Sequence, residues 1–338
     1  MLGLRDLNRT LLGRQHLLRR ADLSTTEMVE HLVGLQAQEP LPPYLSLAAR
    51  IEGFDPQDLS RALETGALVR MLTLRATIHV LTREDALTLR AWVQPVVGRG
   101  NQMSQPAAHV PVEALVAETR RLLADGPLPV KDLGERLHTS FPDAPAAALA
   151  HVAREQLPLA QLPPRGLWKR SGGVVYQAVD GQAAPDVPEL VRRYLRAFGP
   201  ATAADLTTWS RVTRLGPVLA SMTDLVTVEC EDGRRRYDVP DAPYASGDEP
   251  APVRLLGTYD NVWLSHADRS RIAQEDARAR WMGPNGGAAN VVFVDGFLAG
   301  LWRAREGRVV LDELPPLTRT QRSELDEEVV RVEALLAR

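Results

Sequence analysis

The sequence predicts an α+β protein made of three tandem winged-helix units, each a helix-turn-helix followed by a β-wing, and a smaller β-rich domain at the C-terminal end. Two observations lead to this prediction. Helical patterns are followed by a short ribbon of β-forming residues, which is the element order of a winged helix. That order then recurs along the chain, and a recurring pattern indicates repeated structural units.

The first repeat opens with two helical patterns. Residues 4–20 carry apolar residues at helical spacing, and a second pattern follows over 26–36. Ser24 or Thr25 is placed to cap this second helix, and if Ser24 is the cap, Glu27 is the reciprocal partner of a capping box. We expect two short helices over "YLSLAARI" and "DPQDLSRAL", and two strands over "ALVRMLTLRATIHVL", which is rich in β-formers.

The second and third repeats share an opening, because "GPLPVKDLGERL" and "GPATAADLTTWS" both place Gly-Pro ahead of an Asp-Leu pair that begins a helix. Each repeat ends in a candidate hairpin. These hairpins are "LWKRSGGVVYQAV" and "LVTVECEDGRRRYDV", and Asp232-Gly233 in the latter is a strong tight-turn signal. The other expected helices cover residues 112–124 and 144–157 in the second repeat, and 187–198 and 213–221 in the third.

Residues 240–252 have the Pro/Gly/Ser composition of a linker. Beyond the linker, "VRLLGTYDNVWLS", "ANVVFVDGFLAGLWRA" and "RVVLDELPPL" are expected to be strands, and the last twenty residues an amphipathic helix. A small β-rich domain explains this pattern, and a barrel is one arrangement of it. The predicted domains are a first winged helix over 1–105, a second over 106–184, a third over 185–242 and the β-rich domain over 243–338.

The composition narrows the class of protein. The chain has 338 residues and a net charge of −3, so any DNA-binding surface must be a local basic patch. Its single cysteine, Cys230, excludes an internal disulfide and fits a reducing cytoplasm. No apolar run approaches the ~20 residues that span a bilayer, so we expect no membrane partner. Glycine-rich phosphate loops, dinucleotide fingerprints and zinc-deaminase motifs are all missing, so we expect neither a cofactor nor a metal.

One predicted strand is polar on one face. If "LRATIHVL" alternates with a period of two, Arg75, Thr77 and His79 share a face opposite a row of apolar residues. The apolar row packs against helices. The polar face either meets solvent or lines a functional site, and the pattern alone leaves both open.

Two glutamines stand where a helix is expected to stop. Pro40 disfavours the helical conformation at Glu39, so the chain should leave the helix there. In extended chain, Gln36 and Gln38 point the same way, and both amides can converge on one groove. The alternative is that they bond the helix end or the proline loop.

Four stretches together resemble the AlkZ-type family of winged-helix DNA glycosylases, in the right order and over essentially the whole chain. They are "LQAQEPLPPYLSLAAR", "TLRATIHVLTREDAL", "DNVWLSHADRSR" and "VFVDGFLAGLWR". The Gln-x-Gln before Pro-Tyr and the Arg-x-Thr-x-His strand are marks of that family. A sister group has Gln-x-Asp, so Gln38 places this chain in the Gln-x-Gln group.

The resemblance implies three winged helices that form a C-shaped channel for double-stranded DNA, with a β-barrel at the end. Gln36 and Gln38 would line the active site, with Arg75, Thr77 and His79 on the channel wall. The implied reaction is cleavage of the bond between deoxyribose and an N7-alkylated guanine. The Gln-x-Gln group is associated with resistance to DNA-alkylating natural products and with unhooking of interstrand crosslinks, which is DNA repair in the service of self-resistance.

Neutral amides suit this reaction, because an N7-alkylguanine is already cationic and leaves as a neutral base. The amides need only hold a water and stabilise an oxocarbenium-like sugar. Glu39 is a competing candidate base if its backbone turns inward. The only lysines, Lys131 and Lys169, are distant from the glutamines in sequence, so we expect a monofunctional enzyme without a Schiff base.

Basic residues on the two hairpins are candidates for phosphate contacts, although such residues are also ordinary solvated tips. His266 and Arg269 match a family motif for which the sequence suggests no definite role, and Asp268–Arg269 is a candidate structural pair. The hairpin candidates are Lys169, Arg170, Arg234, Arg235 and Arg236.

The competing class is a non-catalytic winged-helix DNA-binding protein or transcriptional regulator, since a fold does not fix function. A regulator usually dimerises on paired half-sites. Three non-identical units without a zipper favour a monomeric clamp instead.

Overall fold

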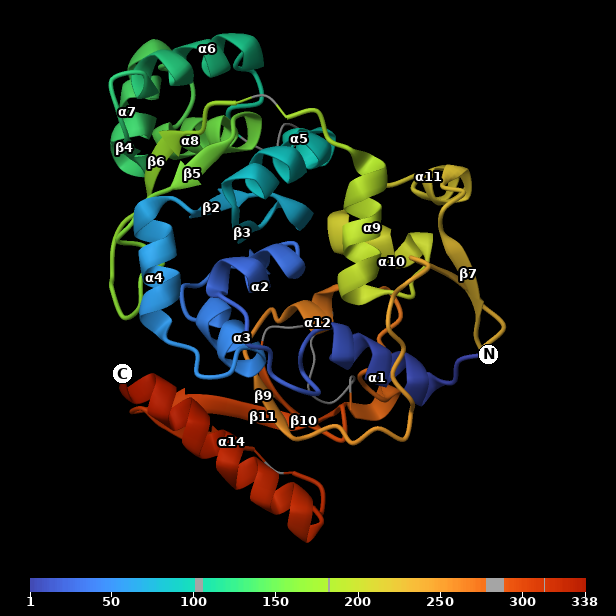
Figure 1. Cartoon of the computed structure of the whole chain (residues 1–338). Coiled ribbons are helices and arrows are strands. Elements are labelled where there is room, and N and C mark those ends of the chain that lie inside the picture. The colour runs from blue at the N-terminus through green and yellow to red at the C-terminus, as the bar shows by residue number, and fades with distance from the viewer. Residues whose placement is uncertain (101–105, 182, 278–288, 313) are drawn as a thin grey trace. The chain divides into compact units, whose positions relative to one another are not determined.

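The computed structural model describes residues 1–100, 106–181, 183–277, 289–312 and 314–338 (Figure 1). Backbone contacts divide the chain into two compact units, and each contains both helices and sheets. The predicted α+β class is therefore confirmed. Unit 1 comprises Met1–Gln36, Leu41–Asp58 and Val187–Arg338, and unit 2 comprises Ala37–Pro40 and Leu59–Asp186.

The N-terminal helices of unit 1 follow the predicted order. The capping box is confirmed, because Ser24 Oγ accepts the N–H of Glu27 at 3.2 Å and the Glu27 carboxylate accepts the N–H of Ser24 at 2.8 Å. The first helix is shorter than expected and ends at Arg14, since His16 has a left-handed φ of 53°. The helices are α1 (Leu4–Arg14), α2 (Thr25–His31), α3 (Pro42–Arg50) and α4 (Pro56–Thr65), the last of which continues into unit 2.

The part of unit 1 over residues 187–238 contains three helices followed by two paired strands, in the element order expected there. Asp232-Gly233 forms the expected turn, in which the N–H of Arg234 donates to Asp232 Oδ1 at 3.0 Å. Aromatic rings of Tyr194, Phe198 and Trp209 pack together in its core. The elements are α9 (Val187–Phe198), α10 (Ala203–Ser210), α11 (Gly216–Ser221), β7 (Val226–Glu229) and β8 (Arg235–Asp238).

The C-terminal part of unit 1 is a four-stranded antiparallel sheet in the order β12-β11-β10-β9, with α14 beside it (Figure 1). Within the described ranges this sheet is open, so the expectation of a barrel is corrected. The predicted strand over 253–265 is also shorter, because Asp260 caps a helical turn instead. The elements are β9 (Arg254–Leu256), α12 (Asn261–Leu264), β10 (Asn290–Val294), β11 (Phe297–Arg305), β12 (Arg308–Leu311) and α14 (Arg319–Ala337).

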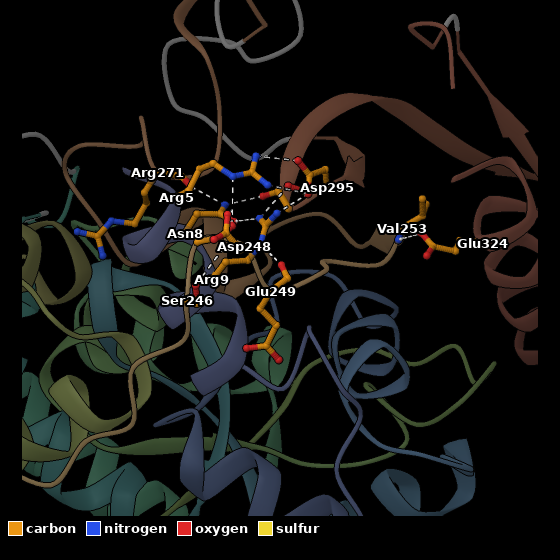
Figure 2. A network of polar contacts seen from close by, with 12 residues as sticks. Arg5, Asn8, Arg9, Ser246, Asp248, Glu249, Val253, Arg271, Asp295 and Glu324 are labelled. Atoms are coloured by element: carbon orange, nitrogen blue, oxygen red, sulfur yellow. Dashed lines mark hydrogen bonds and ion pairs between the residues drawn. The ribbon is translucent and has the colours of Figure 1, made fainter. Parts of the chain in front are cut away.

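Polar side chains tie α1 to the turn between β10 and β11 (Figure 2). Arg5 Nη1 donates to Asp295 Oδ2 at 2.8 Å, and the fully buried Arg9 forms an ion pair with the same carboxylate. Asn8 Nδ2 donates to the carbonyl of Gly296 at 2.8 Å. A Cβ at Gly296 would lie 2.5 Å from Asn8 Oδ1, so only glycine allows this close approach.

Unit 2 contains a sheet in which its own strands lie in the order β3-β2-β5-β6-β4. Its core is centred on Leu115, Leu133, Leu149 and Val152. The hairpin expected over 167–179 differs from the structure, because β6 pairs with the earlier strand β5 and residues 162–174 form the loop between them. The elements are β2 (Leu68–Leu72), η1 (Leu74–Ala76), β3 (Ile78–Thr82), α5 (Arg83–Gly100), α6 (Val112–Leu123), β4 (Leu128–Pro129), α7 (Val130–Ser140), α8 (Ala146–Gln156), β5 (Leu159–Gln161) and β6 (Val175–Ala178).

None of the helices in the described part of the chain is long and apolar enough to cross a membrane.

Candidate active site

The chain reaches Gln36 through a sharp turn at the end of α2. The N–H of Gly34 donates to the carbonyl of Val29 at 2.9 Å, and Val33 and Gly34 have left-handed φ values of 51° and 94°. This is a helix C-terminus of the Schellman type. The expected exit from the helix near Glu39 is therefore wrong, because the helix ends at His31 and the strand β1 (Leu35–Gln36) follows. Gln36 itself is buried.

The next residues are fixed by β3. The N–H of Ala37 donates to the carbonyl of Ile78 at 2.7 Å, and the carbonyl of Ala37 accepts from Arg70 Nη2 at 2.8 Å. The N–H of Ile78 in turn donates to Gln38 Oε1 at 3.2 Å. Since only the oxygen of a carboxamide can accept this bond, the bond sets which way the Gln38 amide faces.

Gln38 is exposed although its amide oxygen is held, and Glu39 is exposed beside it. Because consecutive Cα atoms are 3.8 Å apart, the Cα atoms of Gln36 and Gln38 lie within about 7 Å of each other. The predicted convergence of the two amides on one groove stays a prediction.

The polar strand begins later than the sequence suggested. Arg75 and Ala76 have left-handed φ values of 56° and 55°, and the N–H of Thr77 donates back to the carbonyl of Leu74 at 3.1 Å. These residues form the tight connection between β2 and β3, so strict alternation over 74–77 is wrong. The turn still brings Arg75 to the ring of His79, with Nη2 3.0 Å from Nε2. Thr77 is half-buried, and its hydroxyl donates to the carbonyl of Leu74 at 3.0 Å.

His79 is a neutral group in this arrangement. Its side chain is 1% exposed, and Nδ1 lies 3.0 Å from the carbonyl of Thr77, which requires a proton on Nδ1. Nε2 then accepts from Arg75. Burial holds the pKa of His79 well below its usual value, and the positive charge of Arg75 lowers it further. His79 is therefore neither protonated at neutral pH nor left with a free lone pair.

The two basic regions of the sequence differ in how their charges are paired. Lys169 and Arg170 are exposed in the loop between β5 and β6, and Lys169 Nζ lies 5.7 Å from the ring centroid of Trp168. By contrast, the arginines of the β7–β8 hairpin face carboxylates. These pairs are Arg234–Asp268 at 2.8 Å, Arg235–Glu229 at 3.7 Å and Arg236–Asp232 at 2.6 Å.

Two of the candidate residues, Arg236 and His266, are buried. Arg236 is 3% exposed and bonded to Asp232, and His266 is 2% exposed. The ring of His266 bonds to Ser265 Oγ at 2.8 Å and to the carbonyl of Phe198 at 3.1 Å. Burial lowers the pKa of His266 to about 3, with the positive charge of Arg271 adding to the effect. We therefore no longer expect either side chain to contact DNA.

The remaining candidates are Arg269, Asp268 and Lys131. Arg269 Nε donates to the carbonyl of Trp263 at 3.0 Å, and its guanidinium lies 5.6 Å from the Trp263 ring centroid. The sequence suggested Arg269 as the partner of Asp268. In the structure, the carboxylate of Asp268 accepts a hydrogen bond from Arg234. Lys131 is exposed on α7, with Nζ 3.7 Å from Glu135. In the described ranges, no group of three or more His, Cys, Asp or Glu side chains could hold a metal ion.

The sequence did not single out Arg70 or Ile78, which fix the backbone beside Gln38. Ile78 acts through its peptide group, so its side chain carries no signal. Arg70 lies in a strand of apolar residues and is 2% exposed. A buried arginine in an apolar strand needs a polar partner, and this was the only available clue.

Comparison with known proteins identifies the family to which this chain belongs. A family model described as DNA glycosylase AlkZ-like matches residues 29–335, so the chain belongs to the AlkZ-like DNA glycosylases and is an enzyme that hydrolyses N-glycosyl bonds. A non-catalytic DNA-binding protein or transcriptional regulator is therefore not favoured.

A sequence comparison and a structural comparison each match the chain over nearly its full length to a glycosylase of Streptomyces sahachiroi. An interstrand DNA cross-link repair glycosylase is 24% identical over 362 residues, which cover 94% of this chain and 92% of the relative. The solved structure of the DNA glycosylase AlkZ superposes with a TM-score of 0.82 at 20% identity, and covers 99% of this chain and 97% of that chain. The structural match supports the fold.

Proposed function

We propose that this enzyme is a monofunctional glycosylase that releases cationic N7-alkylated guanines from double-stranded DNA, with Gln36 and Gln38 as its catalytic residues. The observation that carries the proposal is the amide of Gln38, which is held by Ile78, the residue that precedes a neutral histidine in the strand. Ile78 fixes the amide at 3.2 Å, and the lone pair of His79 is taken by Arg75 at 3.0 Å. The Gln38 amide and the His79 ring are thus both held and uncharged, and the nearest charge to His79 is the guanidinium of Arg75.

Such a site matches a substrate that carries its own positive charge. Cleavage of the glycosidic bond of an N7-alkylguanine gives a neutral base, so no general acid is required. What remains is to hold a water near C1′ and to stabilise an oxocarbenium-like sugar. A carboxamide oxygen has two lone pairs, so Gln38 Oε1 can accept from Ile78 and still orient a water. Its fixed dipole then faces the developing positive charge without reorganisation.

Glu39 is the alternative base within this proposal. Its side chain is exposed and adjacent to Gln38 in the chain. If Glu39 removes the proton from water, Glu39→Gln should lose as much excision as Gln38→Ala. In the two-amide mechanism, Glu39→Gln retains excision.

We further propose that DNA lies in a C-shaped channel formed by three winged helices, with domain limits at 1–105, 106–184, 185–242 and 243–338. The element order supports this proposal, since each of the three sets of helices is followed by paired strands. Exposed Lys169, Arg170 and Arg235 are the best candidates for phosphate contacts, with Arg234 weaker because it bonds to Asp268. A single chain acting as a clamp would work as a monomer.

Bulky adducts and interstrand crosslinks are the proposed extension of the substrate range. The relative from Streptomyces sahachiroi is named for interstrand cross-link repair. A crosslinked base cannot be flipped into a tight pocket, so this activity needs an open groove at the glutamines.

The test is base release from duplexes that carry one N7-methylguanine or one bulky N7 adduct. Abasic sites revealed by heat or alkali are expected with the wild-type enzyme and lost in Gln36→Ala and Gln38→Ala. Gln177→Ala is the matched control, because Gln177 is an exposed glutamine on another strand of the same sheet as Ile78. The strand should stay intact before alkali, and borohydride should trap no adduct at Lys131 or Lys169.

A further inference from the structure

Residues 260 and 261, at the start of "DNVWLSHADRSR", contact the chain on both sides of the Gln-x-Gln segment. Asp260 and Asn261 are 3% and 7% exposed, and both lie within unit 1. Asn261 bonds to the turn that precedes Gln36, and Asp260 bonds to the helix that follows Pro40. The sequence suggested no role for this stretch.

Asn261 holds the turn between α2 and β1. Its Nδ2 donates to the carbonyl of Gly34 at 2.8 Å, and more weakly to the carbonyl of Leu32 at 3.3 Å. These two carbonyls flank Val33, whose left-handed φ of 51° turns the chain out of the helix. A β-branched residue rarely adopts this conformation unless its surroundings hold it there. Gln36 follows Gly34 by two residues, so the Asn261 amide helps to set the path that leads to it.

Asp260 fixes Asn261 itself. Its carboxylate accepts hydrogen bonds from both terminal nitrogens of Arg50, at 2.7 and 2.8 Å. It also accepts a hydrogen bond from the N–H of Val262 at 3.0 Å. A buried, bidentate pair of this kind allows little freedom of orientation. Arg50 is the last residue of α3, and its Nη2 also reaches Gln15 Oε1 at 3.2 Å.

The backbone at Gly257, shortly before Asp260 and Asn261, packs closely against the start of α3. A Cβ at Gly257 would lie 3.0 Å from Leu45 Cβ and 3.6 Å from Pro42 Cα. Tyr259, two residues later, has a left-handed φ of 61°. Residues 257–261 therefore contact both the turn that leads into Gln36 and the helix that begins after Pro40.

We propose that Asn261 is a positioning residue for base excision, which places Gln36 by holding the carbonyls of Leu32 and Gly34. This inference rests on the proposed function, in which Gln36 contacts the reacting groups. A misplacement of about 1 Å at such a site can lower the rate on the order of 100-fold.

Asn8 provides a matched control for a merely structural role. It is a second buried asparagine, and its Nδ2 also bridges two backbone carbonyls, those of Arg271 at 2.6 Å and Gly296 at 2.8 Å (Figure 2). Loss of either amide should destabilise unit 1 by a similar amount. Of these two asparagines, Asn261 is the one that bonds to the segment leading into Gln36.

The experiment compares Asn261→Asp and Asn8→Asp, which keep side-chain size but remove the donors, with Asn261→Ala and Asn8→Ala as variants that introduce no new charge. We would measure thermal unfolding, binding of an N7-methylguanine duplex and the single-turnover excision rate at saturating enzyme. Both pairs should lose similar thermal stability. The Asn261 variants should lose excision about 10- to 100-fold with binding within about twofold of wild type, whereas the Asn8 variants should keep both.

A double-mutant cycle with Gln36→Ala tests whether Asn261 acts through Gln36. In that background, Asn261→Ala should cause no further loss of the residual rate. An equal loss in both backgrounds, or an equal loss in the Asn8 variants, would overturn the inference. If Gln36→Ala fails while Asn261→Ala excises normally, only the positioning role is overturned. Wild-type excision by Gln36→Ala would overturn the proposed site and this inference with it.

Discussion

The segment at Gln38 and the β7–β8 hairpin are both polar, but they differ in whether their ionisable side chains are neutral or paired as ions. Beside Gln38, the ionisable ring of His79 is kept neutral by burial and by Arg75. In the hairpin, charges are kept and cancelled in pairs, such as Arg236 with Asp232 at 2.6 Å. The first region holds a neutral amide and a neutral ring in place, and the hairpin holds ions that are paired with opposite charges.

The difference shows that a count of charged residues says little about which charges a ligand can reach. Three consecutive arginines make the hairpin look like the strongest phosphate site in the sequence. The β5–β6 loop has two exposed cations, Lys169 and Arg170, and a third, Arg165, that is half-buried. The variants below test the neutral region first and the charged regions last.

The largest effect is expected from removing the held amides. Gln36→Ala and Gln38→Ala should each lower the single-turnover excision rate by on the order of 100-fold, as when one preorganised polar group is lost elsewhere. Binding of the lesion duplex should change little, because neither side chain carries charge. Gln177→Ala should excise normally. Wild-type rates in both glutamine variants would exclude an amide-lined site.

Substrate scope should follow from the lack of an acid. General acid–base groups typically contribute about 100-fold or more, so neutral lesions should be released at less than roughly 1% of the rate for N7-methylguanine. The measurement is base release from duplexes that differ only in the lesion, including uracil, 8-oxoguanine and ethenoadenine. Efficient release of uracil would show that Glu39 or another residue supplies real acid–base catalysis.

The pH dependence should separate catalysis from stability. His79 has a pKa well below 6.5, so it stays neutral and the excision rate should be flat between about pH 6 and 8. A titration of the rate within that range, lost in His79→Gln, would contradict this expectation.

Stability should nevertheless fall in acid because of His266. Its pKa is about 3 in the folded chain and about 6.5 when unfolded, so only the unfolded chain gains the proton between these values. The free energy of unfolding should drop by about 2 kcal/mol at pH 5 on account of this residue. Urea unfolding from pH 7 to 5 would measure it, and His266→Gln should flatten the slope. An equal slope in both proteins would contradict the buried neutral ring.

The smallest effects are expected from the charged surfaces. Lys169→Ala with Arg170→Ala should weaken binding to all duplexes and reduce the salt slope by up to about 0.9 log units per lost phosphate contact. Arg235→Ala should have a weaker effect, and Arg319→Ala on α14 serves as the control. Arg236→Ala should lower thermal stability without changing the salt slope. A larger slope change from Arg236→Ala than from the loop pair would reverse the comparison.

Local rules predicted much of the fold and little of the site. The Ser24–Glu27 capping box and the Asp232-Gly233 turn depend on neighbours a few residues away, and both are as expected. The end of α2 was misplaced because the turn at Val33 is held by Asn261, 227 residues further from Gly34 along the chain. No pattern near Gln36 reveals that partner.

The strand at His79 illustrates the same limit. Alternation placed Arg75 and His79 on one face, and they do meet, but through a left-handed turn rather than through strand geometry. The pairing of β6 with β5 was missed for a similar reason, since the register depends on a long loop rather than on a tight turn.

The order of the chain has a consequence for synthesis on the ribosome. Arg9 is made early, but its acceptor at Asp295 lies 286 residues later. At roughly 5–20 residues per second, about 15 to 60 seconds separate the two. Unit 2 consists of residues 37–40 and 59–186, so all of its residues have been made well before Asp295. We therefore expect residues 59–186 to fold before the first residues of the chain find their partners, and the bonds from Asn261 to Leu32 and Gly34 can form only after residue 261 has been made.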